Sequence, residues 1–181
     1  MDVSMKRNFR LGPFDGAKFE ATQVSWMSTV EDLGLPPLEY EKTISWVESH
    51  IQYDVKNGDS YAYGIFQNER DDAVAIVDIV HSTRVRDAGL IKMLEVTMGP
   101  ALAPSKITTE SYAELLGIYS EAIVGTIALT AEAHPARIVK LFGRDDDLMK
   151  LFVALNVQLN AQTDAPIKSK LEGRWLVISS N

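Results

Sequence analysis

The chain has 181 residues and a formal net charge of -7, and 46% of its residues are hydrophobic. This length supports one sizeable core, so we expect a single domain over residues 1–181. The acidic balance and the scattered Lys and Arg exclude nonspecific nucleic-acid binding, and the absence of cysteine excludes disulfides and thiolate metal sites.

Neither the N-terminal stretch nor the apolar runs indicate export or membrane insertion. Residues 1–10 are polar and slightly basic, and they lack the apolar stretch of a signal peptide. No apolar run approaches the length of a membrane span. We therefore expect a cytoplasmic protein with no membrane partner.

The first third of the chain predicts one short strand and two helices. The strand covers residues 9–14 and is closed by turn residues. Apolar residues at helical spacing predict one helix over 18–33, which Gly34 ends, and a second from Pro37 to about Val55.

The periodicity then changes to that of strands. Residues 61–67 and 73–82 predict two strands joined by a short charged connection, and 90–98 predict a third. A stretch without regular structure over 99–107 is short enough for one domain, and a long helix over 108–132 follows it.

The segment after this helix combines a strand and a helix. Residues 136–142 form the apolar run of a covered strand, which Gly143 ends. Asp145 to Asp147 follow where a helix start favours negative charge, and apolar residues at helical spacing come next. We expect this helix to end before Asn156, where another strand begins, and a last strand over 174–179.

This order of elements predicts an α/β (α+β) fold with a mixed twisted sheet of about seven strands and helices on both faces. The order resembles that of the GNAT superfamily of acyl-CoA-dependent N-acyltransferases, and the resemblance covers nearly the whole chain. It implies that strands 90–98 and 136–142 are parallel neighbours that splay apart, joined by the long helix. The spacing of elements is also similar to that of GNAT-like internal virion proteins of short-tailed phages.

Two signatures of the family are missing from the sequence. The family motif Arg/Gln-x-x-Gly-x-Gly/Ala after the fourth strand brings backbone amides to the CoA pyrophosphate. Residues 98–109 occupy that place with one glycine and two prolines. Phe152 stands near the Tyr that serves the family as general acid, and Tyr112 and Tyr119 fit core packing better than a site.

The resemblance implies acetyl-CoA or another acyl-CoA as the cofactor, and a small-molecule or protein amine as the acceptor. The strand backbone from Val96 to Met98 would hold the acyl carbonyl. Side chains and amides at the start of the long helix would meet the pyrophosphate: Ser105, Lys106, Thr108 and Thr109.

Two carboxylates are candidates for acid–base chemistry. Glu95 lies in the strand where many GNAT enzymes carry a general base, and desolvation in a cleft would make it more basic. Asp78 interrupts an apolar strand and is a second acid–base candidate, or an anchor for the substrate amine. The alternative for each is a carboxylate on the solvent side of a strand, which for Asp78 follows from simple alternation.

No metal site is predicted. His50, His81 and His134 lack the spacing of metal ligands, and His134 predicts a cation at a helix end. Three consecutive aspartates diverge by about 100° per residue on a helix, so Asp145 to Asp147 indicate a helix start, with Arg144 pairing with one of them.

Two functions remain open at this stage. The first is an acyl-CoA-dependent N-acyltransferase acting on an unidentified amine. The second is a non-catalytic GNAT-like binding or assembly protein, such as a phage virion component located in the virion. A homo-oligomer is compatible with both.

Overall fold

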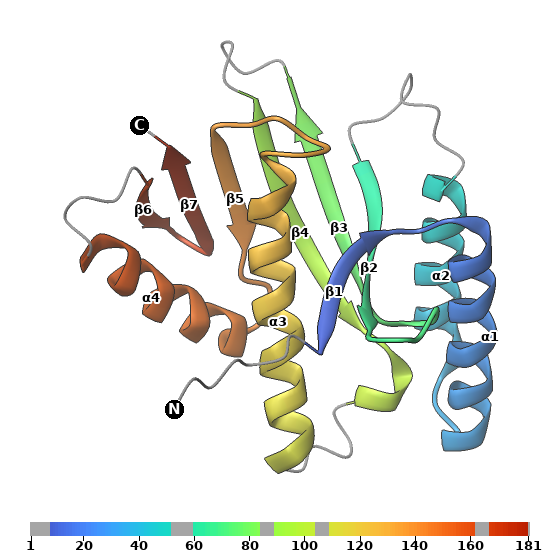
Figure 1. Ribbon diagram of the computed structural model, residues 1–181. Helices are drawn as coiled ribbons and strands as arrows, with labels where there is room; N and C mark the ends of the chain where they lie inside the picture. The colour runs from blue at the N-terminus through green and yellow to red at the C-terminus, as the bar shows by residue number, and fades with distance from the viewer. Residues whose placement is uncertain (1–7, 52–59, 84–88, 104–108, 162–166, 181) are drawn as a thin grey trace. The chain divides into compact units, whose positions relative to one another are not determined.

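The computed structural model describes residues 8–51, 60–83, 89–103, 109–161 and 167–180 (Figure 1). The helices are α1 (Gly16–Leu33), α2 (Pro37–Ile51), α3 (Thr109–Leu129) and α4 (Asp146–Ala161), with a short 3-10 helix, η1 (Pro100–Leu102). The strands are β1 (Phe9–Pro13), β2 (Ser60–Gln67), β3 (Ala73–Ser82), β4 (Leu90–Met98), β5 (Ile138–Phe142), β6 (Ile167–Glu172) and β7 (Trp175–Ser180).

The seven strands form one mixed sheet in the order β1-β2-β3-β4-β5-β7-β6. β4 and β5 are parallel neighbours, whereas β5 with β7, β6 with β7, and β1 with β2 are antiparallel. The predicted fold class is therefore confirmed, as is the parallel pairing of the strands that flank α3. The bounds of β3 and β4 match the predicted ranges to the residue.

The predicted end of α4 is wrong. The helix continues through Asn156 to Ala161, and β6 begins only at Ile167. No glycine or proline interrupts these last turns. Their asparagines bind the neighbouring strand, because Asn160 Nδ2 donates to the backbone oxygen of Ser169 and Ser169 Oγ donates to Asn156 Oδ1, both at 2.9 Å. These contacts hold the extended helix on β6.

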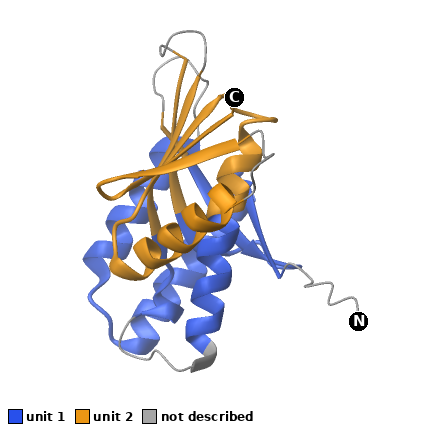
Figure 2. Ribbon diagram, turned by 90° about the vertical axis from the view of Figure 1, so that its left-hand side faces the viewer, with its two compact units in different colours: residues 1–53, 62–76, 97–122 blue, residues 54–61, 77–96, 123–181 orange. Residues whose placement is uncertain are grey.

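The described residues belong to two compact units (Figure 2). Unit 1 comprises residues 1–53, 62–76 and 97–122, and unit 2 comprises 54–61, 77–96 and 123–181. Unit 1 contains β1, α1, α2 and η1, and unit 2 contains β5, α4, β6 and β7.

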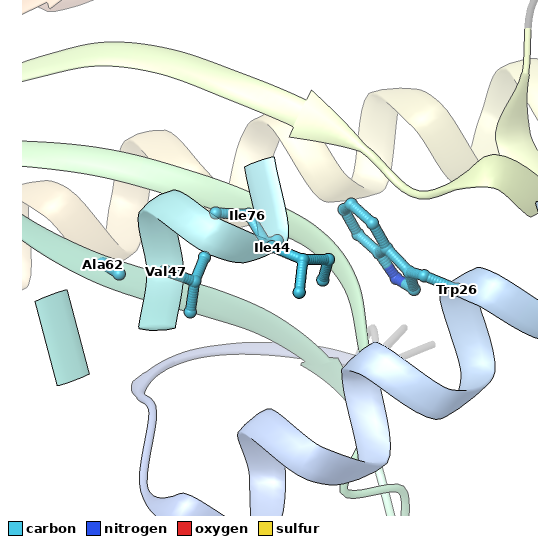
Figure 3. Packing of buried hydrophobic residues seen from close by; sticks show 5 residues of the cluster. All are labelled: Trp26, Ile44, Val47, Ala62 and Ile76. Atoms are coloured by element: carbon cyan, nitrogen blue, oxygen red, sulfur yellow. The ribbon is translucent and has the colours of Figure 1, made fainter. Parts of the chain in front are cut away.

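The core of unit 1 forms where α1 and α2 pack on the sheet (Figure 3). Trp26 of α1 belongs to this core, and its side chain is 3% exposed. Its indole Nε1 donates a hydrogen bond to the backbone oxygen of Ala73 at 2.7 Å. Its ring meets that of Tyr40 edge to face, with centroids 6.1 Å apart. The cluster of buried residues is Trp26, Ile44, Val47, Ala62 and Ile76.

One described helix, α3, is long and apolar enough to cross a membrane by length and composition alone. The window Ser111–Leu129 has a mean hydropathy of 1.3, which the sequence-based reading did not anticipate. The core helix of a soluble protein passes the same test. Six of its residues are buried: Ile118, Tyr119, Ala122, Ile123, Thr126 and Leu129.

Candidate functional site

The hydrogen-bonded pairing between the parallel strands β4 and β5 ends half-way along β4. Their pairing runs from Leu90 opposite Ile138 to Met93 opposite Leu141, whereas β4 continues to Met98. The burial pattern of β4 changes at the same point: Ile91 and Met93 are fully buried, and the five residues after Met93 are all half-buried. β5 itself ends one residue after the last pair, at Phe142, so the predicted splaying of the two strands stays a prediction. Residues 94–96 of β4, which belong to unit 2, lie beyond the last pair with β5.

Glu95 lies in β4, two residues beyond the last pair with β5. Its carboxylate forms an ion pair with the guanidinium of Arg144, which follows β5. The Glu95 side chain is 38% exposed and that of Arg144 is 63% exposed. Glu95 is therefore a partly solvated carboxylate beside a cation, which agrees with the solvent-side alternative rather than with a desolvated base.

The segment that carries Arg144 is held in place by Arg174, which precedes β7. The Arg174 guanidinium donates to the backbone oxygen of Gly143 and, at 3.0 Å, to that of Arg144. In return the Gly143 N–H donates to the Arg174 backbone oxygen at 2.8 Å. A Cβ at Gly143 would meet the end of the Met149 side chain, which would have to shift to make room. Nothing in the sequence pattern had singled out Arg174.

The three aspartates after Arg144 start α4, as predicted. Asp145 precedes the helix, and its Oδ1 accepts a hydrogen bond from the Leu148 N–H at 2.8 Å, which is the geometry of an N-cap. Asp146 lies in the first turn and pairs with Arg174 at 3.3 Å. The predicted pairing of Arg144 with one of these aspartates is wrong, because Glu95 takes that place.

Asp78, the other candidate carboxylate, lies in β3 and is half-buried between the fully buried Val77 and Ile79. Ile76, on the same face of β3 as Asp78, is buried too, so both faces of the strand are covered here, and the Oδ1 atom of Asp78 is itself buried. The catalytic or anchoring role of Asp78 stays a prediction.

The loop after β4 is folded against unit 1. The Gly99 N–H donates to the Val74 backbone oxygen at 2.8 Å, and a Cβ at Gly99 would lie 2.9 Å from that oxygen and 3.0 Å from Trp26 Nε1. The glycine at the place of the family's pyrophosphate motif is thus required for packing. The Leu102 N–H donates to the backbone oxygen of Gly99, and the Ala103 N–H donates to that of Pro100.

The predicted cofactor-binding residues divide into two groups. Ser105, Lys106 and Thr108 lie outside the described residues, and Thr109 is the first residue of α3. Val96 and Met98 lie in β4 beyond its last pair with β5 and are half-buried. Their contacts with a cofactor stay predictions.

The general acid of the family has no counterpart in α4. Phe152 is fully buried there, and α4 contains no tyrosine. Tyr119 in α3 is 6% exposed and belongs to the core, as predicted, whereas Tyr112 is 41% exposed, so its predicted core position is wrong.

Unit 1 contains a cavity of about 180 Å³ that the sequence did not indicate. Arg70 and Asp72 line it as a hydrogen-bonded ion pair, and Ser25 Oγ donates to Asp72 at 2.8 Å. The Arg70 guanidinium lowers the pKa of Asp72, and the carboxylate raises the pKa of Arg70. The side chains of Arg70, Asp72 and Ser25 therefore form hydrogen bonds with one another.

In unit 2 the ring of His134 contacts the rings of Tyr61 and His81, tilted against each. The rings of His81 and His134 are 5.0 Å apart, and those of Tyr61 and His134 are 4.3 Å apart. Burial and the nearby charge of His81 lower the pKa of His134 to about 4. His134 is therefore neutral at pH 7, and its prediction as a helix-end cation is wrong. The described residues contain no group of three metal-binding side chains.

This histidine gives a stability prediction. Because the pKa of His134 is about 4 in the folded chain against 6.5 in the unfolded one, only the unfolded chain gains a proton there between these values. The free energy of unfolding should fall by about 1–3 kcal/mol from this group as the pH drops from 6.5 to 4. Urea denaturation across this range measures it. His134→Gln should flatten the slope and His50→Gln should not; equal slopes in both variants would contradict the assignment.

Comparison with known proteins gives similarity at the level of solved structures. No family model matches the chain, and no curated protein sequence matches it. The N-acetyltransferase PseH of Campylobacter jejuni is 12% identical over 94% of this chain and 96% of its own, with a TM-score of 0.46. An acetyltransferase from Streptococcus agalactiae is 9% identical over 96% and 98%, with a TM-score of 0.43.

A third similar structure is Arabidopsis thaliana Naa50 in complex with the bisubstrate analogue CoA-Ac-MVNAL. It is 8% identical over 96% of this chain and 98% of its own, with a TM-score of 0.41. At these identities and TM-scores, no residue role passes from these proteins to this chain. The mixed seven-stranded sheet with parallel β4 and β5 rests on the structure itself. The likeness to phage virion proteins stays a prediction.

Proposed function

We propose that the chain is an acyl-CoA-dependent N-acyltransferase that acts on an amine. The observation that carries this proposal is that β4 continues beyond its last pair with β5 at Met93, with Glu95 and its ion-pair partner Arg144 just past that pair. Backbone groups there can bind an extended ligand as they would bind a strand. The amide-containing arm of an acyl-CoA is such a ligand, and a strand N–H near Val96 would polarise its acyl carbonyl.

Glu95 supplies the acid–base group in this proposal. A carboxylate accepts a proton from the acceptor's ammonium through a water molecule, and the neutral amine then attacks the thioester carbonyl. The C–N bond forms and the C–S bond breaks. The amine's second proton ends on the leaving thiolate, so the products are an amide, the CoA thiol and one proton released to solvent.

A thermal-shift titration with acetyl-CoA and longer acyl-CoAs tests cofactor binding. A ligand that binds only the folded chain raises the melting temperature with its concentration. We expect a concentration-dependent rise with at least one acyl-CoA and release of the CoA thiol when an amine is added. No shift with any acyl-CoA would overturn the proposal.

We expect cofactor affinity to be weak and sensitive to salt. Pro100 and Pro104 remove two backbone donors, and Gly99 is committed to packing, so charge and the helix start must hold the pyrophosphate. Lys106→Ala should remove most of the affinity at low ionic strength, and the wild-type affinity should fall towards physiological salt. Titrations at two salt concentrations measure both. Tight, salt-insensitive binding by Lys106→Ala would show that the cofactor lies elsewhere.

A second candidate is a non-catalytic GNAT-like binding or assembly protein. It is favoured by the buried Phe152 at the family's acid position and by the committed amide of Gly99. Light scattering of the purified chain, together with the acyl-CoA titration, separates the two. Stable self-association without any acyl-CoA binding supports this second candidate.

A further inference from the structure

We propose that the acceptor is an α-amino acid whose carboxylate binds Arg144 while its amine lies beside Glu95. This inference rests on the proposed acyl transfer and names the acceptor class for the same site. It follows from how the ion pair between Glu95 and Arg144 is built.

The ion pair is open to a ligand. Arg144 and Glu95 are 63% and 38% exposed, and both belong to unit 2. Ion pairs with this exposure are weak, because water solvates and salt screens both charges. A ligand that offers the same two charges in one molecule therefore competes with the pair at little cost.

Hydrogen bonds on both sides of Arg144 hold the backbone that carries its side chain. Arg174 donates to the backbone oxygens of Gly143 and Arg144, and Asp145 on the other side caps α4. The flanking backbone is thereby ordered before any ligand arrives, which reduces the entropy lost on binding. Arg174 acts here as a positioning residue.

The partner of Arg144 distinguishes it from Arg70. Arg70 pairs with Asp72, which also accepts from Ser25, so that pair holds the β2–β3 turn to α1. Arg144 pairs with the carboxylate that the proposed reaction uses. When a substrate ammonium approaches Glu95, it displaces the guanidinium, and Arg144 needs a new anion.

An α-amino acid supplies that anion on the carbon that bears the amine. Its carboxylate can take two parallel hydrogen bonds from the planar guanidinium, and its ammonium replaces the guanidinium beside Glu95. Every charge is then paired again. An amine without a carboxylate would leave Arg144 unpaired, so the site should discriminate by the carboxylate. The amide bond forms at the α-nitrogen, with protons and thiol accounted for as in the proposed transfer.

The first test compares acceptors with the full chain and a saturating acyl-CoA. Each proteinogenic amino acid is assayed by release of the CoA thiol, and the best is compared with its methyl ester and its decarboxylated amine. We expect kcat/KM to be about tenfold or more higher for the free amino acid. Arg144→Gln should abolish this preference. Arg137→Gln, which removes the same charge from an exposed arginine just before β5, should keep it.

The second test measures acceptor binding without catalysis, by ligand-detected NMR with the same amino acids. Binding by the wild type that Arg144→Gln loses supports the acceptor class, even if no acyl transfer occurs, in which case only the proposed transfer fails. Equal kcat/KM for acid and ester overturns the acceptor class while the transfer stands. Absence of both binding and transfer for every amino acid overturns the acceptor class.

Discussion

Glu95→Gln should lower the kcat for acyl transfer by about 10²–10⁴-fold and leave acyl-CoA binding nearly unchanged. The amide of glutamine has almost the shape of the carboxylate, but it cannot accept the proton that the acceptor's ammonium must lose. The proposed function assigns the cofactor to strand backbone and to groups after β4, so its Kd should not follow this change. Steady-state kinetics and a thermal-shift titration measure the two effects separately.

A matched control removes the same charge elsewhere in unit 2. Glu172 ends β6 and pairs with Lys140 and Lys170, so Glu172→Gln changes the net charge equally and leaves the Glu95–Arg144 pair in place. Its turnover should match that of the wild type. Unchanged turnover in Glu95→Gln would remove Glu95 from the mechanism. A loss of acyl-CoA binding in that variant would show instead that Glu95 holds the cofactor.

Element order was predictable because periodicity and turn residues are local properties. The runs that became β3 and β4 are bounded by charged or turn residues on both sides, and their bounds were predicted to the residue. The end of α4 was not predictable in this way. It depends on Asn156 and Asn160 meeting Ser169 of β6, a contact that exists only once the strand is in place.

The candidate site was predictable only in part, for the same reason. Glu95 was found from its place in a strand, as the resemblance implied. Its partner Arg144 was assigned to the neighbouring aspartates, because the sequence shows adjacency along the chain but not the register of β4 against β5. Arg174 lies 30 residues from Arg144 in sequence and is joined to it only through folded backbone.

The loop after β4 has a structural role that the sequence did not reveal. The sequence showed one glycine where the resemblance implied a pair, but not what that glycine does. In the structure Gly99 lies against Trp26 and Val74 with no room for a Cβ. The packing of α1 and the position of this loop therefore depend on one another.

Trp26→Ala should accordingly be the most destabilising single change discussed for unit 1, at about 3–5 kcal/mol in the free energy of unfolding. The change removes a side chain that is 3% exposed, its edge-to-face contact with Tyr40, and the donor to the Ala73 oxygen. It also removes the surface on which Gly99 lies. Urea denaturation of the full chain measures the loss.

Two further variants separate the contributions of the indole. Trp26→Phe keeps an aromatic ring but leaves the buried Ala73 oxygen without its donor, so it should cost about 1–3 kcal/mol from that hydrogen bond. Trp46→Ala removes a half-buried indole from the edge of the same core and should cost less than Trp26→Ala. If Trp26→Ala cost under about 1 kcal/mol, the indole would not hold the core and loop together. If Trp26→Phe cost as much as Trp26→Ala, the hydrogen bond would outweigh the packing of the ring.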